Sequence, residues 1–102
     1  MTVSVNDKDF YLYDCISFFD RLKGFMFEKN INYCKRFKKC NSIHTFFMLD
    51  SIDVVMTDKN NNVLYIFKNL KPNRIILPKK NVYYTYEFPK NTIDRLNKIC
   101  CL

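Results

Sequence analysis

Two titratable side chains stand in apolar surroundings near the middle of this sequence. His44 is the only histidine among the 102 residues, and an imidazole can act as a general base or as a metal ligand. Asp53 stands within an apolar segment, residues 52–57, where a buried carboxylate must be paired or hydrogen-bonded, or its pKa rises. The two residues could therefore form a polar ligand site, or an active site that moves a proton between them.

Strand alternation predicts which neighbours accompany these two residues. If residues 43–48 form a strand, His44 and Met48 share one face, and Thr45 lies on the other. We take a candidate ligand-binding polar site from this segment and the next one, formed by His44, Thr45, Met48 and Asp53.

Each titratable candidate also has a structural interpretation. His44 can be a buried imidazole that hydrogen-bonds to the backbone. Asp53 can accept hydrogen bonds from the amides of a neighbouring loop, or pair with Arg21 or Arg74. We favour the structural role for Asp53, and we name no catalytic residue, because His44 has no second histidine or acid close to it in sequence.

The cysteines give no recognisable metal or disulfide framework. Cys34, Cys40 and His44 form a C-x5-C-x3-H pattern, which lacks both the short cysteine pair and the fourth ligand of a structural zinc site. The count of five is odd, and the adjacent Cys100 and Cys101 cannot easily bridge each other. We therefore expect free thiols, no metal and no cofactor. The single glycine also argues against phosphate-cradling P-loop and Rossmann motifs.

Composition favours one folded domain, residues 1–102. An apolar fraction of 48% is too high for a disordered chain, and no apolar run reaches the roughly 18–20 residues of a membrane span. The formal net charge is +7, and residues 21–40 carry seven basic side chains against one acidic one. A basic surface can attract nucleic acid or anionic lipid, but we interpret this one first as a solvated face.

The apolar pattern predicts a mainly β chain. Strands are expected at 2–5, 9–13, 33–37, 43–48, 52–57, 63–67 and 82–88, with a hairpin turn at 58–62. Cys15, Phe18, Phe19 and Leu22 fall on one face of a short helix that Asp14 could cap and Gly24 could end. Asn91 could cap a last helical turn. The fold class is α+β, mainly β: a compact twisted sheet or partial barrel of antiparallel-rich strands, one short helix after the second strand, and a C-terminal helical turn.

Several segments of the chain together resemble the DUF192 family of small domains of unassigned function. The matching segments are Arg21-Leu22-Lys23-Gly24-Phe25-Met26-Phe27, Cys40 through Met48 with its His44-Thr45-Phe46-Phe47-Met48 core, Ile52-Asp53-Val54-Val55, Asn69-Leu70-Lys71-Pro72 and Tyr86-Glu87-Phe88-Pro89. The resemblance implies a compact, mainly β fold with a packed helix, and no established enzyme activity. Compared with that family, an asparagine replaces a turn glycine at position 61 or 62, and the chain end lacks the usual closing strand, which would leave a sheet edge open.

These observations favour a non-catalytic binding or accessory domain for an unknown ligand or protein partner. One alternative is a basic binder of nucleic acid or of an anionic surface, although we do not expect nucleic acid to be the partner. A second alternative is an enzyme that uses His44 and Asp53. We expect a cytoplasmic monomer of bacterial type with no membrane span.

Overall fold

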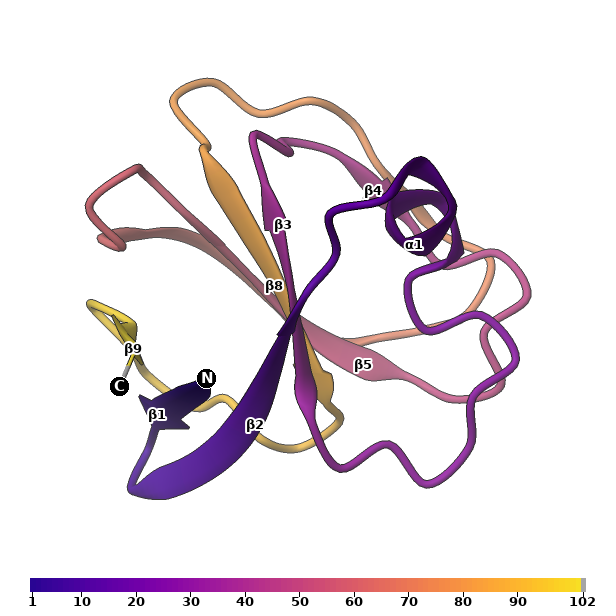
Figure 1. Ribbon diagram of the computed structural model, residues 1–102, viewed down its shortest axis with the longest axis horizontal. Helices are drawn as coiled ribbons and strands as arrows, with labels where there is room; N and C mark the ends of the chain where they lie inside the picture. The colour runs from indigo at the N-terminus through magenta and orange to yellow at the C-terminus, as the bar shows by residue number, and fades with distance from the viewer. Residues whose placement is uncertain (102) are drawn as a thin grey trace.

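The computed structural model describes residues 1–101 as a curled sheet with one short helix (Figure 1). The main sheet has seven strands in the order β6-β5-β8-β3-β2-β1-β9, and β4 pairs with β7 in a second, two-stranded sheet. The elements are β1 (Thr2–Val5), β2 (Lys8–Asp14), α1 (Phe18–Lys23), β3 (Cys34–Lys38), β4 (Ile43–His44), β5 (Ile52–Thr57), β6 (Val63–Leu70), β7 (Ile75–Ile76), β8 (Tyr84–Pro89) and β9 (Cys100–Cys101).

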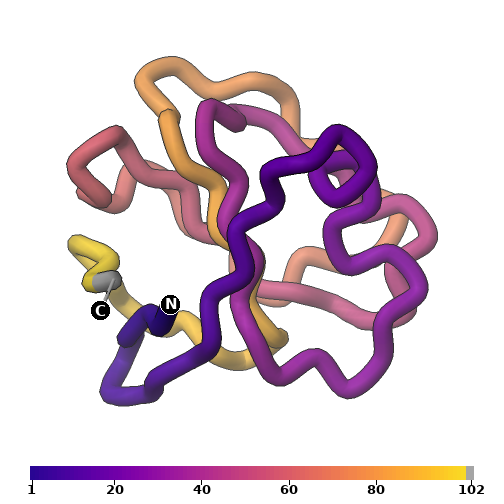
Figure 2. Tube along the Cα trace, viewed as in Figure 1, coloured from indigo at the N-terminus to yellow at the C-terminus, as the bar shows by residue number. Residues whose placement is uncertain are grey.

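The strand pairs confirm the predicted mainly β class. All neighbouring strands are antiparallel except β2 and β3, which run parallel and are joined by α1 and the loop after it. A parallel pair needs such a crossover, because the chain must return to the end of the sheet at which the first strand began. The tube in Figure 2 shows this crossover as the indigo-to-purple path that leaves the sheet, forms the helix and returns.

Two apolar clusters lie on the two faces of the sheet. Within β5, Val55 packs in the cluster that contains Val3, Tyr86 and Ile99, whereas Val54 and its alternate neighbours pack with Phe25. Every residue of β5 is buried, because both faces of this strand are covered. Strand β8 alternates in the same way, so that its odd-numbered residues face the side on which α1 lies.

The helix differs from the prediction in its start and in its orientation. It begins at Phe18, and its cap is Ser17, whose hydroxyl accepts the amide of Asp20, rather than Asp14. Gly24 ends it as expected, with a positive φ of 50°. The predicted apolar face points into solvent, since no helical residue is buried, and only Cys15, before the helix, enters the core.

Two predicted segments are shorter or more exposed than expected. Only Ile43 and His44 of the predicted strand 43–48 pair in a sheet, because the chain turns at Thr45 and Phe47 adopts a positive φ of 61°. Strand β6 forms the predicted hairpin with β5, but it lies at the sheet edge and contains no buried residue. In the hairpin turn, Asn61 takes the left-handed conformation with φ 63°, which explains how asparagine replaces glycine.

The chain end contradicts two expectations. Cys100 and Cys101 do form a strand, β9, which pairs with β1, so the sheet edge at β1 is closed rather than open. The predicted C-terminal helical turn is absent, because Asn91 adopts φ 59° and does not cap a helix. The amides of Thr92 and Ile93 instead donate to Asp53 Oδ2, both at 2.8 Å.

Asp53 of β5 therefore connects this strand to the end of β6 and to the segment after β8. Its Oδ1 accepts the amide of Asn69 at 2.8 Å, and the side chain is fully buried. This is the loop-amide role that we favoured from sequence, and the partners of the carboxylate are backbone amides rather than Arg21 or Arg74.

Replacing Asp53 is expected to destabilise the domain strongly. In Asp53→Asn the new NH2 group would face backbone donors, and in Asp53→Ala three amides, two of them in buried hydrogen bonds, lose their acceptor. We expect a loss of about 2–4 kcal/mol and a Tm lower by about 10 °C or more, measured by thermal unfolding. Asp50→Asn is the matched control, because Asp50 is half-exposed and paired with Lys90, and it should cost less than about 1 kcal/mol. An unchanged Tm for Asp53→Asn would contradict this role.

Candidate functional site

The four residues predicted as a polar site do not converge on one cavity. Thr45 is fully buried, and its hydroxyl donates to the Lys71 carbonyl at 2.7 Å and accepts the Arg74 amide at 2.8 Å. Met48 is buried in the apolar cluster around Phe25. The oxygens of Asp53 are bonded to backbone amides as described above. His44, in contrast, lines a cavity, so the structure separates the predicted set.

That cavity lies between the end of α1 and the sheet. Its volume is about 110 Å³, and it is lined by the α1 end, by the segment from β3 to β4, and by β8: Arg21, Leu22, Lys23, Gly24, Phe37, Cys40, Ser42, Ile43, His44 and Glu87. The Nδ1 atom of His44 accepts the amide of Phe46 at 3.2 Å, which places the proton of a neutral imidazole on Nε2. We call this space the Glu87 cavity.

Glu87 is the unusual group of the cavity. Its side chain is only 2% exposed, and its Oε1 atom has no hydrogen-bond partner among residues 1–101. A buried polar atom of this kind is costly, and native proteins contain few of them. Strand alternation puts Glu87 on the α1 side of β8, while Tyr86 and Phe88 pack into the opposite cluster.

A lysine and a second glutamate hold the surroundings of Glu87 in place. The Lys35 ammonium is buried and donates to the Gly24 carbonyl at 2.6 Å and to Glu28 Oε2 at 2.7 Å. Tyr33 donates its hydroxyl to Glu28 Oε1 at 2.7 Å. Partial burial alone would raise the pKa of Glu28, but the hydrogen bonds from Lys35 and Tyr33 hold it below its usual range. Lys35 and Glu28 therefore form a neutral pair without Glu87.

Gly24 allows the close approach of Glu87. A methyl group on Gly24 would lie 3.1 Å from Oε1, which is tighter than ordinary van der Waals contact, and its positive φ disfavours any other residue. The glycine thus ends the helix and leaves room for the carboxyl group beside it.

Burial also changes the protonation of this site. Desolvation raises the pKa of Glu87 to about 8, since the nearby Lys35 charge compensates only in part and Glu28 adds to the rise. Burial likewise raises the pKa of the Cys15 thiol to about 12. At neutral pH Glu87 is therefore mostly a neutral carboxylic acid, and Cys15 is a protonated thiol rather than a nucleophile.

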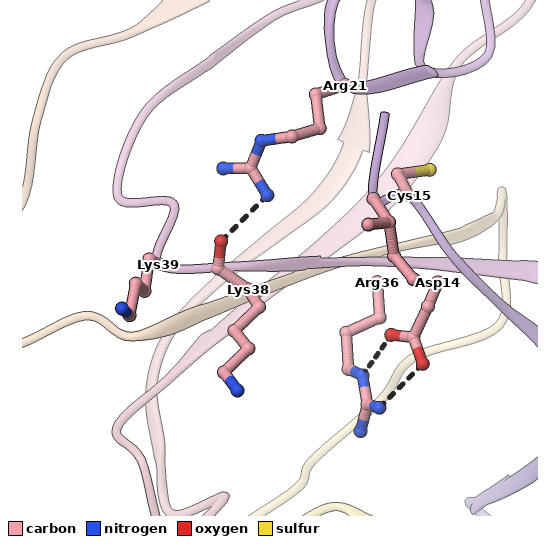
Figure 3. Close-up of a pocket in the computed structure, with 7 residues that line it drawn as sticks. Asp14, Cys15, Arg21, Arg36, Lys38 and Lys39 are labelled. Atoms are coloured by element: carbon pink, nitrogen blue, oxygen red, sulfur yellow. Dashed lines mark hydrogen bonds and ion pairs between the residues drawn. The ribbon is translucent and has the colours of Figure 1, made fainter. Parts of the chain in front are cut away.

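A larger, basic cleft adjoins the Glu87 cavity and shares Arg21 with it. This cleft has a volume of about 450 Å³ and is lined by Asp14, Cys15, Ile16, Arg21, Arg36, Lys38 and Lys39. In Figure 3 the Arg21 guanidinium reaches the Lys38 carbonyl, at 2.7 Å, while Asp14 faces Arg36 in a two-point ion pair. Arg21, Lys38 and Lys39 give the cleft a positive charge that no acidic side chain within residues 1–101 neutralises in an ion pair.

Some of the basic side chains that a nucleic-acid surface would use have partners within the domain. Lys35 is buried with Glu28, and Arg36 is paired with Asp14. Lys79 lies over the ring of Tyr65 on β6. Lys35 and Arg36 are thus already engaged in ion pairs within the domain.

The cysteine side chains that the structure describes show no metal arrangement. Cys15, Cys34, Cys40 and Cys100 are thiols that form no disulfide, and the side chain of Cys101 lies outside the described part of the structure. Within the described part of the chain, no three His, Cys, Asp or Glu side chains are placed to hold a metal ion.

Sequence reasoning missed Glu87, although a signal for it was present. Glu87 is the one charged residue in the strand Tyr84–Pro89, and Asp53 is likewise the one charged residue in β5. The pattern identifies a buried carboxylate but not its surroundings, because Gly24, Lys35 and His44 come from three other segments.

Comparison with known proteins fits this architecture. A sequence model of DUF192, described as an uncharacterised ACR, matches residues 1–98. The chain belongs to the DUF192 family. A UPF0127 protein of Thermococcus sibiricus is 40% identical over 87 residues, covering 79% of this chain and 56% of the relative. One of Pyrococcus horikoshii is 42% identical over 80 residues, covering 72% and 68%. These relatives are archaeal, so they do not support the expected bacterial type.

Two solved structures share the fold of this DUF192 domain. A protein of unknown function from Novosphingobium aromaticivorans has a TM-score of 0.76 at 15% identity, covering 98% of this chain and 82% of that one. A candidate transcription regulator from Sinorhizobium meliloti has a TM-score of 0.76 at 12% identity, covering 97% and 89%. At such identities the likeness concerns the fold alone. The chain spans a little over half the length of the first curated relative.

The sequence predicted no membrane span, and the helix of the structure can be compared with that prediction. Within the described residues, the structure contains no helix long and apolar enough to cross a membrane. The compartment and the oligomeric state remain predictions.

The raised pKa of Glu87 predicts how stability depends on pH. The unfolded chain releases the Glu87 proton near its ordinary pKa of 4.5, whereas the folded domain keeps it to about pH 8. The stability that the folded domain gains by keeping Glu87 protonated is therefore fully present below pH 4.5, and it is lost as the pH rises toward 8. Glu87→Gln cannot ionise, so its Tm should not share this loss. We expect the Tm of Glu87→Gln minus the Tm of wild type to be larger at pH 8 than at pH 5, by at least about 5 °C.

The exposed Asp94→Asn serves as the control, and its Tm should follow that of wild type at both pH values. Parallel curves for wild type and Glu87→Gln across pH 5–8 would show that Glu87 titrates normally, contrary to the raised pKa.

Proposed function

We propose that this domain is a non-catalytic binding domain that takes a ligand carboxylate in the Glu87 cavity. The observation that carries the proposal is the buried Oε1 of Glu87, which lacks a partner among residues 1–101, in a residue that lines a cavity together with His44. An unpartnered buried oxygen is a cost that a bound ligand would remove. Nothing in the proposal requires a reaction.

The charge of the rim argues for an anionic ligand. Arg21 and Lys23 line the cavity, and Arg21 also lines the basic cleft beside it. Cations at the mouth attract an anion and repel an amine. Below pH 8 the neutral Glu87 carries a proton, and with that proton on Oε1 it donates a hydrogen bond to the ligand carboxylate.

The size of the cavity limits the part of the ligand that enters. A volume of about 110 Å³ holds roughly three or four water molecules, which suits a carboxylate and a carbon or two. The rest of the ligand would lie in the basic cleft. Either a free small acid or the C-terminus of a peptide presents this chemistry.

The enzyme alternative loses its proton relay in this arrangement. Both oxygens of Asp53 accept backbone amides, so Asp53 supports the fold rather than a partnership with His44. For the nucleic-acid alternative, two of the basic side chains in residues 21–40, Lys35 and Arg36, are already held in ion pairs with Glu28 and Asp14. The binding role is therefore the function that the geometry favours.

Titration followed by NMR would test the proposal. Propionate, and a short peptide with either a free or an amidated C-terminus, are added to the protein at pH 7. We expect the carboxylates to shift the amide signals of Gly24 and His44 with a Kd on the order of 1 mM, and the amidated peptide to have no effect. A response to the peptide alone would identify a C-terminus, and a response to propionate a free acid.

The pH dependence separates the proposed bond from general attraction by the cations. Wild type should bind about tenfold more weakly at pH 9 than at pH 7, since Glu87 loses its proton near pH 8. Glu87→Gln keeps a neutral donor and should bind equally at both pH values. Absence of carboxylate binding to wild type, or an unchanged pH dependence in Glu87→Gln, would refute the proposal.

A further inference from the structure

Helix α1 presents its apolar side chains to solvent and its polar ones to the protein. Phe18 is 83% exposed, Phe19 is 70% exposed and Leu22 is 52% exposed. Arg21, on the other face, donates to the Lys38 carbonyl. This orientation is the reverse of an ordinary amphipathic helix on a globular domain, whose apolar stripe covers the core.

Further exposed apolar side chains adjoin the helix. Phe46, Ile75 and Leu77 line an open groove of about 350 Å³ together with His44. His44 and Leu22 also line the Glu87 cavity, so the groove and the helix are neighbours. Figure 1 shows α1 and β4 on the same side of the sheet. We call the set the α1-side apolar surface: Phe18, Phe19, Leu22, Phe46, Ile75 and Leu77.

An exposed aromatic pair extends this side of the molecule. The rings of Phe27 and Phe47 stack with centroids 5.8 Å apart, and both side chains are more than 60% exposed. The Phe27 amide donates to the Phe47 carbonyl at 3.0 Å, which holds the two loops together. The rings therefore protrude at fixed positions and do not cover any core.

Exposed cations lie near parts of this surface, with Lys38 and Lys39 in the cleft beside Arg21 of α1, and Arg74 next to Thr45. Lys38, Lys39 and Arg74 are exposed and make no ion pair within residues 1–101, whereas Glu28 and Asp50 are each paired with a lysine. Asp20 of α1 accepts the Tyr13 hydroxyl and carries one negative charge, so these four groups together keep a net positive charge that complements a negatively charged partner.

We propose that the α1-side apolar surface docks on an anionic lipid bilayer. Separate phenylalanine, leucine and isoleucine side chains on a short helix and several loops can enter the interfacial region one by one, and they need no matching shape in the partner. The cations then lie at the level of anionic headgroups, each of which adds to the attraction. A protein partner would instead need a large face of matching shape. This inference does not depend on the proposed carboxylate site.

The absence of tryptophan from the chain allows a direct test. Phe18→Trp places one tryptophan on the surface, and Leu64→Trp places one on the exposed edge strand β6 as a matched control. Each full-length variant is mixed with vesicles of phosphatidylcholine alone, or with 30% phosphatidylglycerol. We expect a blue shift of the emission for Phe18→Trp with the anionic vesicles only, and no shift for Leu64→Trp.

Sedimentation with the same vesicles measures the two contributions separately. The double variants Phe18→Ser/Phe19→Ser and Lys38→Glu/Lys39→Glu should each lower the partition coefficient at least tenfold, while Tyr11→Ser, another exposed aromatic, should leave it unchanged. Circular dichroism confirms that each variant is folded.

Three results would overturn the inference: an unshifted Phe18→Trp spectrum with anionic vesicles, equal binding to neutral vesicles, or a wild-type dimer in light scattering that Phe18→Ser/Phe19→Ser converts to a monomer. The last result would assign the surface to self-association.

Discussion

The ammonium of Lys35 is a buried charge, and the arrangement around the Glu87 cavity follows from satisfying it. Its hydrogen bonds to the Gly24 carbonyl and to Glu28 fasten the segment after α1 to the strand β3. A buried cation needs partners of opposite charge or polarity, and Glu28 provides the opposite charge in an ion pair with Lys35. Glu28 neutralises Lys35, and the second carboxyl group nearby, Glu87, is left without a charge partner of its own among the described residues.

This division of roles explains two features that would otherwise be unrelated. Glu87 stays protonated because the adjacent buried cation, Lys35, is already bonded to Glu28, so burial determines its pKa. Helix α1 turns its polar side toward the domain because the groups there, Arg21 and the Gly24 carbonyl, complete this polar layer. Its phenylalanines are then necessarily on the outer side.

The sequence predicted the elements of this fold better than their environment. Alternation and turn residues were sufficient for β5, the hairpin to β6 and strand β8, since these patterns are local. The loop-amide role of Asp53 also followed from a carboxylate in an apolar strand. The orientation of α1 did not, because the helical period shows which residues share a face but not which face meets the protein.

The site itself depended on contacts between distant segments. His44 was identified from its residue type, but its cavity neighbours Gly24 and Glu87 are far from it in sequence, and Thr45 and Met48 are used for packing and loop bonding. The turn at Thr45 was also beyond prediction, since it depends on hydrogen bonds with the loop around Arg74.

The most direct measurement is the titration of the Glu87 carboxyl carbon by NMR, in protein labelled with ¹³C and with Glu87→Gln used to assign the signal. We predict a pKa of about 8 in the free domain, and a higher value when propionate is bound, because the ligand requires the protonated form. A pKa near the ordinary 4.5, or one that propionate leaves unchanged, would contradict the claim that Glu87 is a neutral, ligand-binding acid.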